Sequence, residues 1–200
     1  WTYLHLYLFG KRLTERRELS TLRSLILPGM VIADIGANVG FYTLEMAAGV
    51  GGKGRVVAFE PDPFNFPLLQ ARAKTAASAN IDAYQVALGD TSGTAMLHSS
   101  VYNRADNRLS PSHTEPHVEV CEVEVRTLDA FLSARGTPAV DALKIDVQGN
   151  EAHVLRGARK TLAAGVQWIW VEFSPDHLRG AGSDPERFLE SLGELGMDLF

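Results

Sequence analysis

Residues 31–44 read VIADIGANVGFYTL, an apolar segment followed by a tight turn and then by the start of a helix. The segment at 31–35 has the length and the β-branched content of a strand that is buried on both faces, as in a parallel sheet. Gly36 and Gly40 bracket the turn, where a side chain would keep a ligand away from the backbone. The helix that begins at Phe41 directs its free N–H groups to the same place. This stretch therefore predicts a nucleotide-type cofactor site.

The residue types in this turn favour a cationic cofactor over a dinucleotide. The dinucleotide fingerprint G-x-G-x-x-G needs a second glycine where this chain has Asn38. A pyrophosphate would favour an anion-binding turn, whereas we expect Asp34 to place a negative charge at the mouth of the site. S-adenosylmethionine, with its sulfonium and ammonium groups, fits that polarity. The spacing favours a methyltransferase over a dehydrogenase, and an ordinary strand and turn remains the alternative.

A second acidic position follows about one β-α-β unit later. Residues 54–59, GRVVAF, have the pattern of the next strand, and Glu60 follows directly. In doubly wound sheets, ligands bind beyond the carboxyl ends of the strands, and an acidic residue roughly 20 positions after the glycine turn binds the ribose hydroxyls. Pro61 and Pro63 would stiffen the loop into the next helix. We therefore expect Glu60 to bind a ribose.

Composition restricts the class of protein. A chain of 200 residues suits one domain, and a net charge of -5 without a basic cluster argues against a nucleic-acid partner. Cys121 is the single cysteine, which excludes an intramolecular disulfide and a cysteine-based metal site and is consistent with a cytoplasmic location. No apolar run reaches the roughly 20 residues of a membrane span.

Strand and helix patterns alternate along the chain, which predicts an α/β fold with an open, mostly parallel, doubly wound sheet. The expected strands are 31–35, 55–60, 81–88, 140–146, 167–173 and one from 197, and the expected helices are 14–27, 41–49, 64–78, 150–163 and 184–195. We expect residues 1–28 to form an N-terminal aromatic segment and helix, and residues 29–200 to form the main domain. Because a strand is expected to begin where the chain stops, we expect a truncated C-terminus.

One segment departs from this alternation. Residues 94–99 and 117–126 alternate like strands, which predicts an inserted β-hairpin. The polar connection between them is expected to act as a lid over the substrate. The candidate contacts in this connection are Asn103, Arg104, Asn107, Arg108 and His113.

A further acidic residue lies at the end of a central strand. Residues 141–151 read DALKIDVQGNE, and period two places Lys144 and Asp146 on one face of the strand. Asp146 at the carboxyl end would face the reactive end of the cofactor. We expect Lys144 to pair with a carboxylate beneath the pocket. We expect Glu151 to stabilise the N-terminus of the next helix.

The next strand also ends with an acid, Glu172. In the usual strand order, Glu172 and Asp146 lie on neighbouring strand ends, where they could bind sugar hydroxyls, share a proton or hold a divalent ion. The metal alternative is weaker because no third oxygen ligand is evident. His177 is expected near the same rim, and His153, inside a helix, is expected to be structural.

These motifs together resemble the FkbM family of S-adenosylmethionine-dependent methyltransferases. The motifs are DIGANVGFYTL, FEPDP, VALGD at 86–90, LKIDVQGNEAHVLRGA at 143–158 and VEF at 171–173. The resemblance covers roughly residues 30–175. Gln148 departs from the family, which usually has an acid there, and Asn150 stands where a small residue is common.

The resemblance implies a Rossmann-like class I methyltransferase fold and O-methylation of a hydroxyl on a sugar, a polyketide or a related small metabolite. It assigns cofactor contacts to Asp34, Gly36, Asn38, Gly40, Glu60, Ala87 and Leu88, with the last two near the adenine. It also places Asp146 near the transferred methyl group.

Methyl transfer from a sulfonium is an in-line displacement, so alignment of the reacting atoms supplies much of the acceleration. Removal of the hydroxyl proton would help. We expect Asp146 to accept this proton, with Glu172 or His177 as alternatives. The other functions considered are an N-methyltransferase, an RNA ribose methyltransferase and a non-catalytic cofactor-binding domain. The first often carries an Asn/Asp-Pro-Pro-Tyr/Phe signature, which is absent, and the second would need a basic surface.

Overall fold

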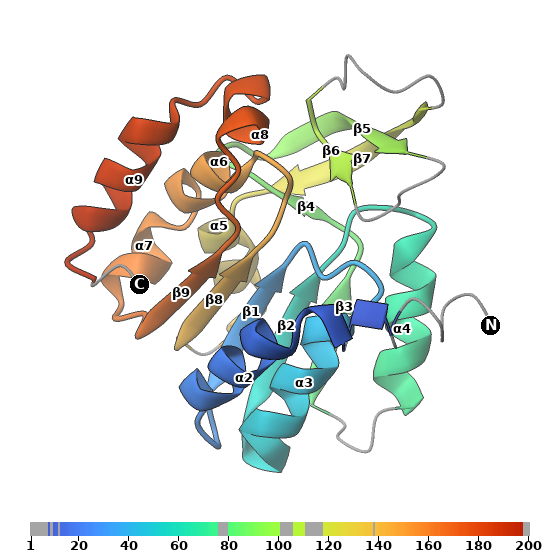
Figure 1. Ribbon diagram of the computed structural model, residues 1–200, viewed down its shortest axis with the longest axis vertical. Helices are drawn as coiled ribbons and strands as arrows, with labels where there is room; N and C mark the ends of the chain where they lie inside the picture. The colour runs from blue at the N-terminus through green and yellow to red at the C-terminus, as the bar shows by residue number, and fades with distance from the viewer. Residues whose placement is uncertain are drawn as a thin grey trace.

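The computed structural model describes residues 8, 10–11, 13–75, 80–100, 106–110, 118–137 and 139–197. A five-stranded sheet in the order β3-β2-β1-β8-β9 forms its centre (Figure 1). The strands are β1 (Val31–Ile35), β2 (Arg55–Phe59), β3 (Ile81–Tyr84), β8 (Ala142–Ile145) and β9 (Trp168–Val171). All neighbouring pairs are parallel, so the carboxyl ends of the strands meet along one edge.

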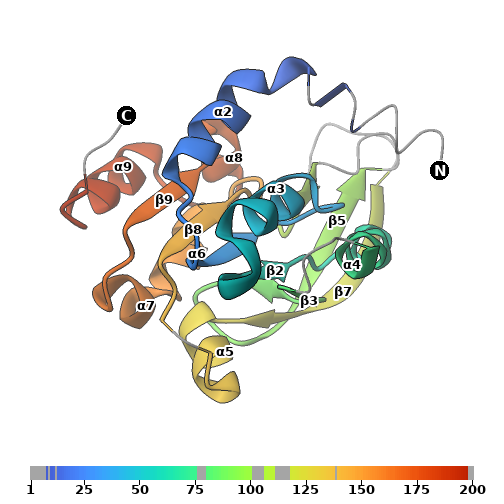
Figure 2. The ribbon, with the colours of Figure 1, turned by 90° about the horizontal axis from the view of Figure 1, so that it is seen from below.

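Helices cover both faces of this sheet. On one face lie α2 (Arg16–Leu25), α3 (Phe41–Val50) and α4 (Asn65–Thr75), and on the other lie α5 (Leu128–Arg135), α6 (Glu151–Arg156), α7 (Arg159–Ala163), α8 (Pro175–Gly180) and α9 (Pro185–Gly193). Figure 2 shows α2 and α5 on opposite sides of the strands. Ile32 and Ile35 in β1 are at most 1% exposed, because side chains on both faces are covered. The doubly wound, parallel sheet expected from the sequence is confirmed.

A second sheet is attached beside the first, in the order β4-β7-β5-β6. Its strands are β4 (Ala87–Leu88), β5 (Gly93–Ser100), β6 (Asn107–Arg108) and β7 (Val118–Arg126). β5 and β7 are antiparallel, from Gly93 opposite Val125 to Ser100 opposite Val118, which confirms the inserted hairpin. Leu97 and Val123 bury a small core of their own beneath it.

Several predicted elements differ from the structure. The strand expected at 81–88 is two strands, β3 and β4, because the chain passes from one sheet to the other after Tyr84. The helices α5 and α8 were not predicted. Their end signals are present: the Thr127 hydroxyl accepts a hydrogen bond from the Ala130 N–H at the start of α5, and Pro175 begins α8. The aromatic segment and the strand expected from 197 lie almost entirely outside the described residues.

The helix expected at 150–163 is interrupted after Arg156, where α6 ends and α7 follows at Arg159. Gly157 occupies the break. A Cβ at this position would lie 2.0 Å from the backbone oxygen of Gly89 and 3.3 Å from Cβ of Thr127. The break therefore brings the end of α6 into backbone contact with the chain that follows β4.

Gly157→Ala is expected to lower the free energy of unfolding by about 1–3 kcal/mol, because backbone atoms must move to admit the methyl group. Gly180→Ala is the matched control, since nothing lies within 4 Å of a Cβ added there. The control should be neutral or slightly stabilising. Urea unfolding of both variants measures the difference, and equal stabilities would contradict the close contact at Gly157.

Candidate active site

The carboxyl ends of β1, β2 and β8 open into a pocket. Six of the residues predicted to hold the cofactor or face its methyl group line this pocket: Gly36, Asn38, Glu60, Ala87, Leu88 and Asp146. They come from the turn after β1, the end of β2, the strand β4 and the end of β8. The other two, Asp34 and Gly40, are not among the lining residues. The strand order thus brings most of the predicted site together.

The turn after β1 is held by backbone contacts on two sides. The N–H groups of Gly36 and Ala37 both donate to the Phe59 carbonyl, at 3.0 and 2.9 Å. Gly36 has a φ of 79°, and a Cβ there would lie only 1.9 Å from the backbone oxygen of Asp146. No other residue type fits this position without moving β1 away from β8. The glycine therefore keeps the two strand ends in contact at the floor of the pocket.

Glu60 lies beside this turn and is 4% exposed. Its Oε2 accepts a hydrogen bond from the Asn38 N–H at 2.7 Å, and its Oε1 accepts one from the Asp62 N–H at 2.9 Å. Burial raises the pKa of Glu60 to about 7, although the two N–H donors act in the opposite direction. The carboxylate is thus fixed in one orientation within the pocket lining.

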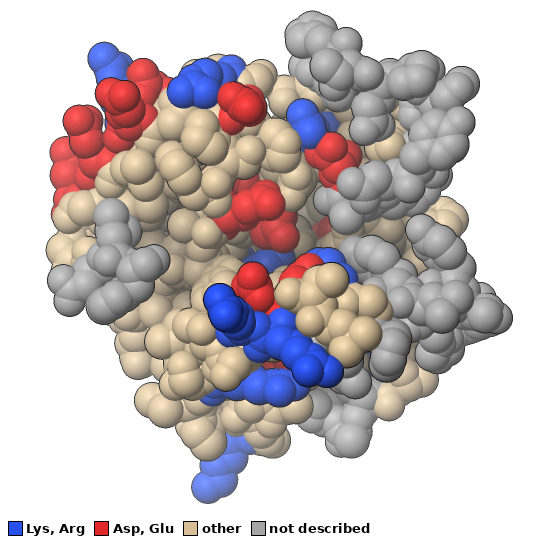
Figure 3. All heavy atoms as spheres, viewed as in Figure 1, with Lys and Arg blue, Asp and Glu red and all other residues tan. Residues whose placement is uncertain are grey.

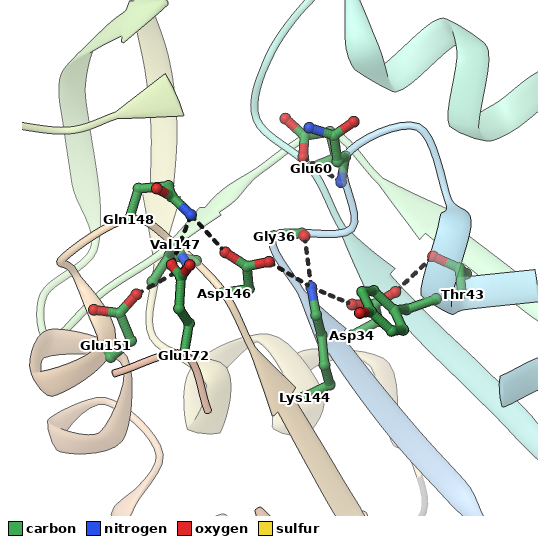
Figure 4. Close-up of polar contacts among 12 residues, drawn as sticks. Asp34, Gly36, Thr43, Glu60, Lys144, Asp146, Val147, Gln148, Glu151 and Glu172 are labelled. Carbon is green, nitrogen blue, oxygen red and sulfur yellow. Dashed lines mark hydrogen bonds and ion pairs between the residues drawn. The ribbon is translucent and has the colours of Figure 1, made fainter. Parts of the chain in front are cut away.

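The expectation that Asp34 places its charge at the mouth of the site is wrong. Its side chain is fully buried beneath the turn, at 0% exposed, between β1 and α3. The Thr43 hydroxyl of α3 donates to Oδ2 at 2.5 Å, and the Lys144 ammonium lies 3.3 Å from Oδ1 (Figure 4). The position of Asp34 near the end of β1 did not determine the direction of its side chain. The side chain points toward α3, which covers one face of the sheet.

Lys144 connects the buried carboxylate to the pocket, and its side chain is 3% exposed. It lies opposite Asp34 in the register of β1 and β8. Its Nζ donates to the Gly36 carbonyl at 2.9 Å and lies 3.6 Å from Oδ2 of Asp146. Burial disfavours the ammonium, but Asp34 and Asp146 outweigh this effect and raise the pKa of Lys144. The prediction that Lys144 pairs with a carboxylate beneath the pocket is confirmed.

Asp146 and Glu172 lie at neighbouring strand ends and share one amide donor. Nε2 of Gln148 donates to Asp146 at 2.8 Å and to Glu172 at 2.7 Å (Figure 4). Gln148 has a φ of 53°, which turns its side chain back over the end of the strand. The sequence predicted the two carboxylates at adjacent strand ends, and it gave no role to the amide between them. Asp146 and Glu172 are called the acid pair below, and Gln148 is called its bridge.

The two carboxyl groups have opposite pKa shifts. Burial opposes ionisation of Asp146, but Lys144 and the hydrogen bond from Gln148 prevail and lower its pKa. Partial burial, together with the charges of Asp146 and Glu151, raises the pKa of Glu172 to about 7. When the pair carries one proton, that proton therefore resides on Glu172, and Asp146 remains ionised; as the pH rises through 7, Glu172 loses it.

Glu151 stabilises the turn between the acid pair and α6. Its Oε1 accepts hydrogen bonds from the N–H groups of Val147 and Gly149, both at 3.1 Å, and the residue is 1% exposed. These bonds give Glu151 a structural role in the turn before α6, and the predicted stabilisation of the helix N-terminus by its charge stays a prediction. His153 is structural as predicted, since its Nδ1 lies 2.9 Å from Asp90 on the loop after β4.

His177, in α8, lies near the acid pair but is engaged elsewhere. Its Nε2 is 3.1 Å from Nη2 of Arg108, which in turn forms two hydrogen bonds to Asp106 at 2.5 and 2.7 Å. A guanidinium only donates, so Nε2 of His177 is the acceptor and its lone pair is used. Of the predicted lid residues, Asn107 and Arg108 are described, whereas Asn103, Arg104 and His113 lie outside the described residues.

A second cleft adjoins the pocket. Both are lined by Lys11, Tyr42, Lys144, Asp146 and Gln148. The second cleft is further lined by Glu15, Glu18, Asp106, Trp170, Glu172 and His177. Figure 3 shows acidic side chains gathered near the centre of this face. Asp146 and Gln148 thus line both spaces, and Glu172 lines the second cleft beside them.

The described part of the chain contains no group of three or more His, Cys, Asp and Glu side chains placed to hold a metal ion. Within the same residues, none of the helices has the length and apolar character needed to cross a bilayer.

Known proteins are similar to this chain in sequence and in fold. The model of the FkbM methyltransferase domain matches residues 34–198. The 2-O-methyltransferase NoeI of Sinorhizobium fredii is 29% identical over 164 residues, which cover 76% of this chain and 66% of NoeI. The 31-O-demethyl-FK506 methyltransferase FkbM of Streptomyces tacrolimicus is 31% identical over 158 residues, which cover 65% of this chain and 60% of that protein. The chain therefore spans less than two thirds of these relatives.

A third relative is the hexuronic acid methyltransferase AglP of Haloferax volcanii, 27% identical over 164 residues, which cover 82% of this chain and 62% of AglP. Among solved structures, Aeropyrum pernix fibrillarin in complex with S-adenosyl-L-methionine has a TM-score of 0.51 at 16% identity, covering 92% of this chain and 66% of fibrillarin. This likeness confirms the class I methyltransferase fold. On the match over residues 34–198, the chain belongs to the FkbM methyltransferase family.

Proposed function

We propose that this chain is the catalytic domain of an S-adenosylmethionine-dependent O-methyltransferase that acts on a hydroxyl of a sugar, a polyketide or a related small molecule. The observation that carries the proposal is the junction of the two clefts. One cleft contains the glycine turn and Glu60, the other is open and polar and contains Glu172, and Asp146 lines both. The names of NoeI and FkbM both specify O-methyltransfer, and the name of AglP specifies a hexuronic acid acceptor.

The residues of the first pocket fit this cofactor. Gly36 presents backbone rather than bulk at the turn, and Glu60, which accepts a hydrogen bond from the Asn38 N–H, presents a fixed carboxylate beside it. The carboxylate is suited to accept hydrogen bonds from the two ribose hydroxyls. Ala87 and Leu88 supply apolar surface for a base. When bound, the cofactor supplies an electrophilic methyl group on a sulfonium.

The two carboxyl groups of the acid pair have different roles at the acceptor hydroxyl. Glu172, whose pKa is about 7, is the group that takes the proton at neutral pH, because a base with a pKa near the working pH is the most effective. Asp146 remains ionised and orients the hydroxyl. This assignment reverses the roles expected from the sequence, where Asp146 was the first choice. His177 is less suited because Arg108 occupies its acceptor nitrogen.

The second cleft favours an acceptor that is neutral and rich in hydroxyl groups. Carboxylates outnumber ammonium groups among its lining residues, with Glu15, Glu18, Asp106, Asp146 and Glu172 against Lys11 and Lys144. Carboxylates accept hydrogen bonds from sugar hydroxyls and repel anions. The half-buried Trp170 offers an aromatic surface in the same cleft. The acidic lining also disfavours RNA as the acceptor.

Isothermal titration with S-adenosylhomocysteine tests the cofactor assignment. The chain is expected to bind one molecule, and Glu60→Ala is expected to weaken binding by about 10- to 100-fold, because hydrogen bonds to a charged group contribute about 1.5–3 kcal/mol. Glu124→Ala, on the exposed side of β7, is the matched control and should bind like the unmodified chain. Thermal unfolding of Glu60→Ala separates lost binding from lost folding.

Unchanged affinity in folded Glu60→Ala would remove the ribose assignment. Absence of binding to the unmodified chain would contradict the proposed function itself.

A further inference from the structure

Among the described residues of the inserted hairpin, Asn107 is the one polar side chain that lines the pocket. This residue lies in β6, and the register of β5 and β6 places it opposite Ser99. Around it, Leu97 and Leu109 line the pocket together with Ala87 and Leu88 of β4. Asn107 is therefore an amide within a largely apolar part of the pocket, where the base of a nucleoside would be in contact with apolar side chains.

The orientation of this amide is fixed by a buried carboxylate. Nδ2 of Asn107 donates to Oδ2 of Asp62 at 2.9 Å, and the hydroxyl of Ser99 donates to the same oxygen at 2.8 Å. Asp62 is 0% exposed, and its Oδ1 accepts from the N–H groups of Phe64 and Asn65 at 2.6 and 3.0 Å. A carboxylate in this network offers acceptors only, so the nitrogen of Asn107 must face it.

The amide oxygen of Asn107 consequently points away from Asp62, and this oxygen has no hydrogen-bond partner although it is buried. Within the described residues it is one of few such atoms, and among them it alone belongs to a residue that lines the first pocket. A buried acceptor without a donor is unfavourable and calls for an explanation. A ligand that brings an N–H donor into the pocket would satisfy it.

We propose that Oδ1 of Asn107 accepts a hydrogen bond from the exocyclic amino group of the cofactor's adenine. The proposal rests on the proposed function, since it concerns the cofactor of that reaction. The inserted hairpin then selects the base. A base with a carbonyl at the same position presents an acceptor instead of a donor. Two acceptors would face each other, so Asn107 discriminates adenine from hypoxanthine.

Titration calorimetry with two ligands tests the proposal, using S-adenosylhomocysteine and its deaminated analogue S-inosylhomocysteine. The unmodified chain is expected to prefer the adenosyl compound by about 10- to 100-fold, the effect of leaving a buried polar group without its partner. Asn107→Leu, which keeps the size of the side chain and removes the acceptor, is expected to reduce this preference to about threefold or less. Weaker binding of both ligands to the variant does not affect this ratio.

Ser99→Ala is the matched control. It removes the other hydrogen bond to the same oxygen of Asp62 but leaves the acceptor of Asn107 in place. This variant should keep the preference of the unmodified chain, and thermal unfolding shows whether both variants are folded. If S-adenosylhomocysteine binds but Asn107→Leu keeps the full preference, or if the unmodified chain has none, the proposal is wrong. If the unmodified chain binds neither ligand, the proposed function fails as well.

Discussion

Glu172→Gln is expected to lower kcat by about 10²- to 10⁴-fold, the usual contribution of a general base, and to leave the affinity for S-adenosylhomocysteine unchanged. Glutamine keeps the size of the side chain and its contact with Gln148 but has no site for a proton. The side chain lines the second cleft and not the cofactor pocket, so cofactor binding should not change. The rate is measured as transfer of a labelled methyl group to a glycoside acceptor.

The pH profile identifies which member of the acid pair is the base. Glu172, with a pKa of about 7, is protonated below that pH, so kcat should rise as the pH passes through 7 and then level off. The pKa of Asp146 is lowered, so a reaction that used Asp146 would have a flat profile from pH 6 to pH 8. A flat profile in the unmodified chain would therefore contradict the assignment to Glu172.

Asp146→Asn is the informative companion variant. The charge of Asp146 raises the pKa of Glu172, and that of Lys144 lowers it. Removal of the aspartate charge eliminates the first effect and leaves Lys144 without one of its partners, so the acidic limb of the profile should move below pH 7. A limb that stays at the same pH would show that the two carboxyl groups are not coupled.

The sequence predicted the acid pair because strand ends in a parallel sheet meet at one edge. Asp146 and Glu172 each follow an apolar strand, and the strand order then places them side by side. The amide of Gln148 was missed because its contact depends on a positive φ in the turn, which no periodicity indicates. The only signal was its position before Gly149, in a turn where the family usually has an acid.

The direction of a side chain was harder to predict from the sequence than the position of its residue at a strand end. Asp34 and Glu60 both lie at or near strand ends, but only Glu60 reaches the pocket. Asp34 is still within β1, and its side chain points to the face covered by α3, where Lys144 lies beside it. A strand buried on both faces is apolar along its whole length, so its sequence has no apolar-polar alternation to show which face a side chain takes.

The secondary structure was predictable where the apolar pattern of the sequence extended over a whole element. The central strands and α3 follow continuous apolar patterns, and the structure confirms them. The short helices α5 and α8 have no long apolar pattern, and the sequence marks only their first residues, with Thr127 as the N-cap of α5 and Pro175 at the start of α8. The division of residues 81–88 between two sheets follows from the attachment of the hairpin, a tertiary contact that a local pattern does not contain.

Lys144→Met is expected to lower the free energy of unfolding by about 3–5 kcal/mol, because removal of one partner leaves a buried charge without compensation. The charge is that of Asp34, which also accepts a hydrogen bond from the Thr43 hydroxyl. The Gly36 carbonyl loses its hydrogen bond from Nζ in the same variant. Methionine keeps the length of the side chain, so the effect is electrostatic. Urea unfolding at neutral pH measures it.

Arg55→Met is the matched control, since Arg55 in β2 pairs with Asp82 at 2.6 Å but both side chains are exposed, at 54% and 37%. An exposed pair contributes about 0–1 kcal/mol, so this variant should lose little. The double variant Asp34→Asn/Lys144→Met removes both charges and should recover much of the stability that Lys144→Met loses. If Lys144→Met loses no more than Arg55→Met, the ammonium does not neutralise Asp34. If the double variant recovers nothing, the loss comes from the Gly36 contact and the packing, and the charge of Asp34 is not its cause.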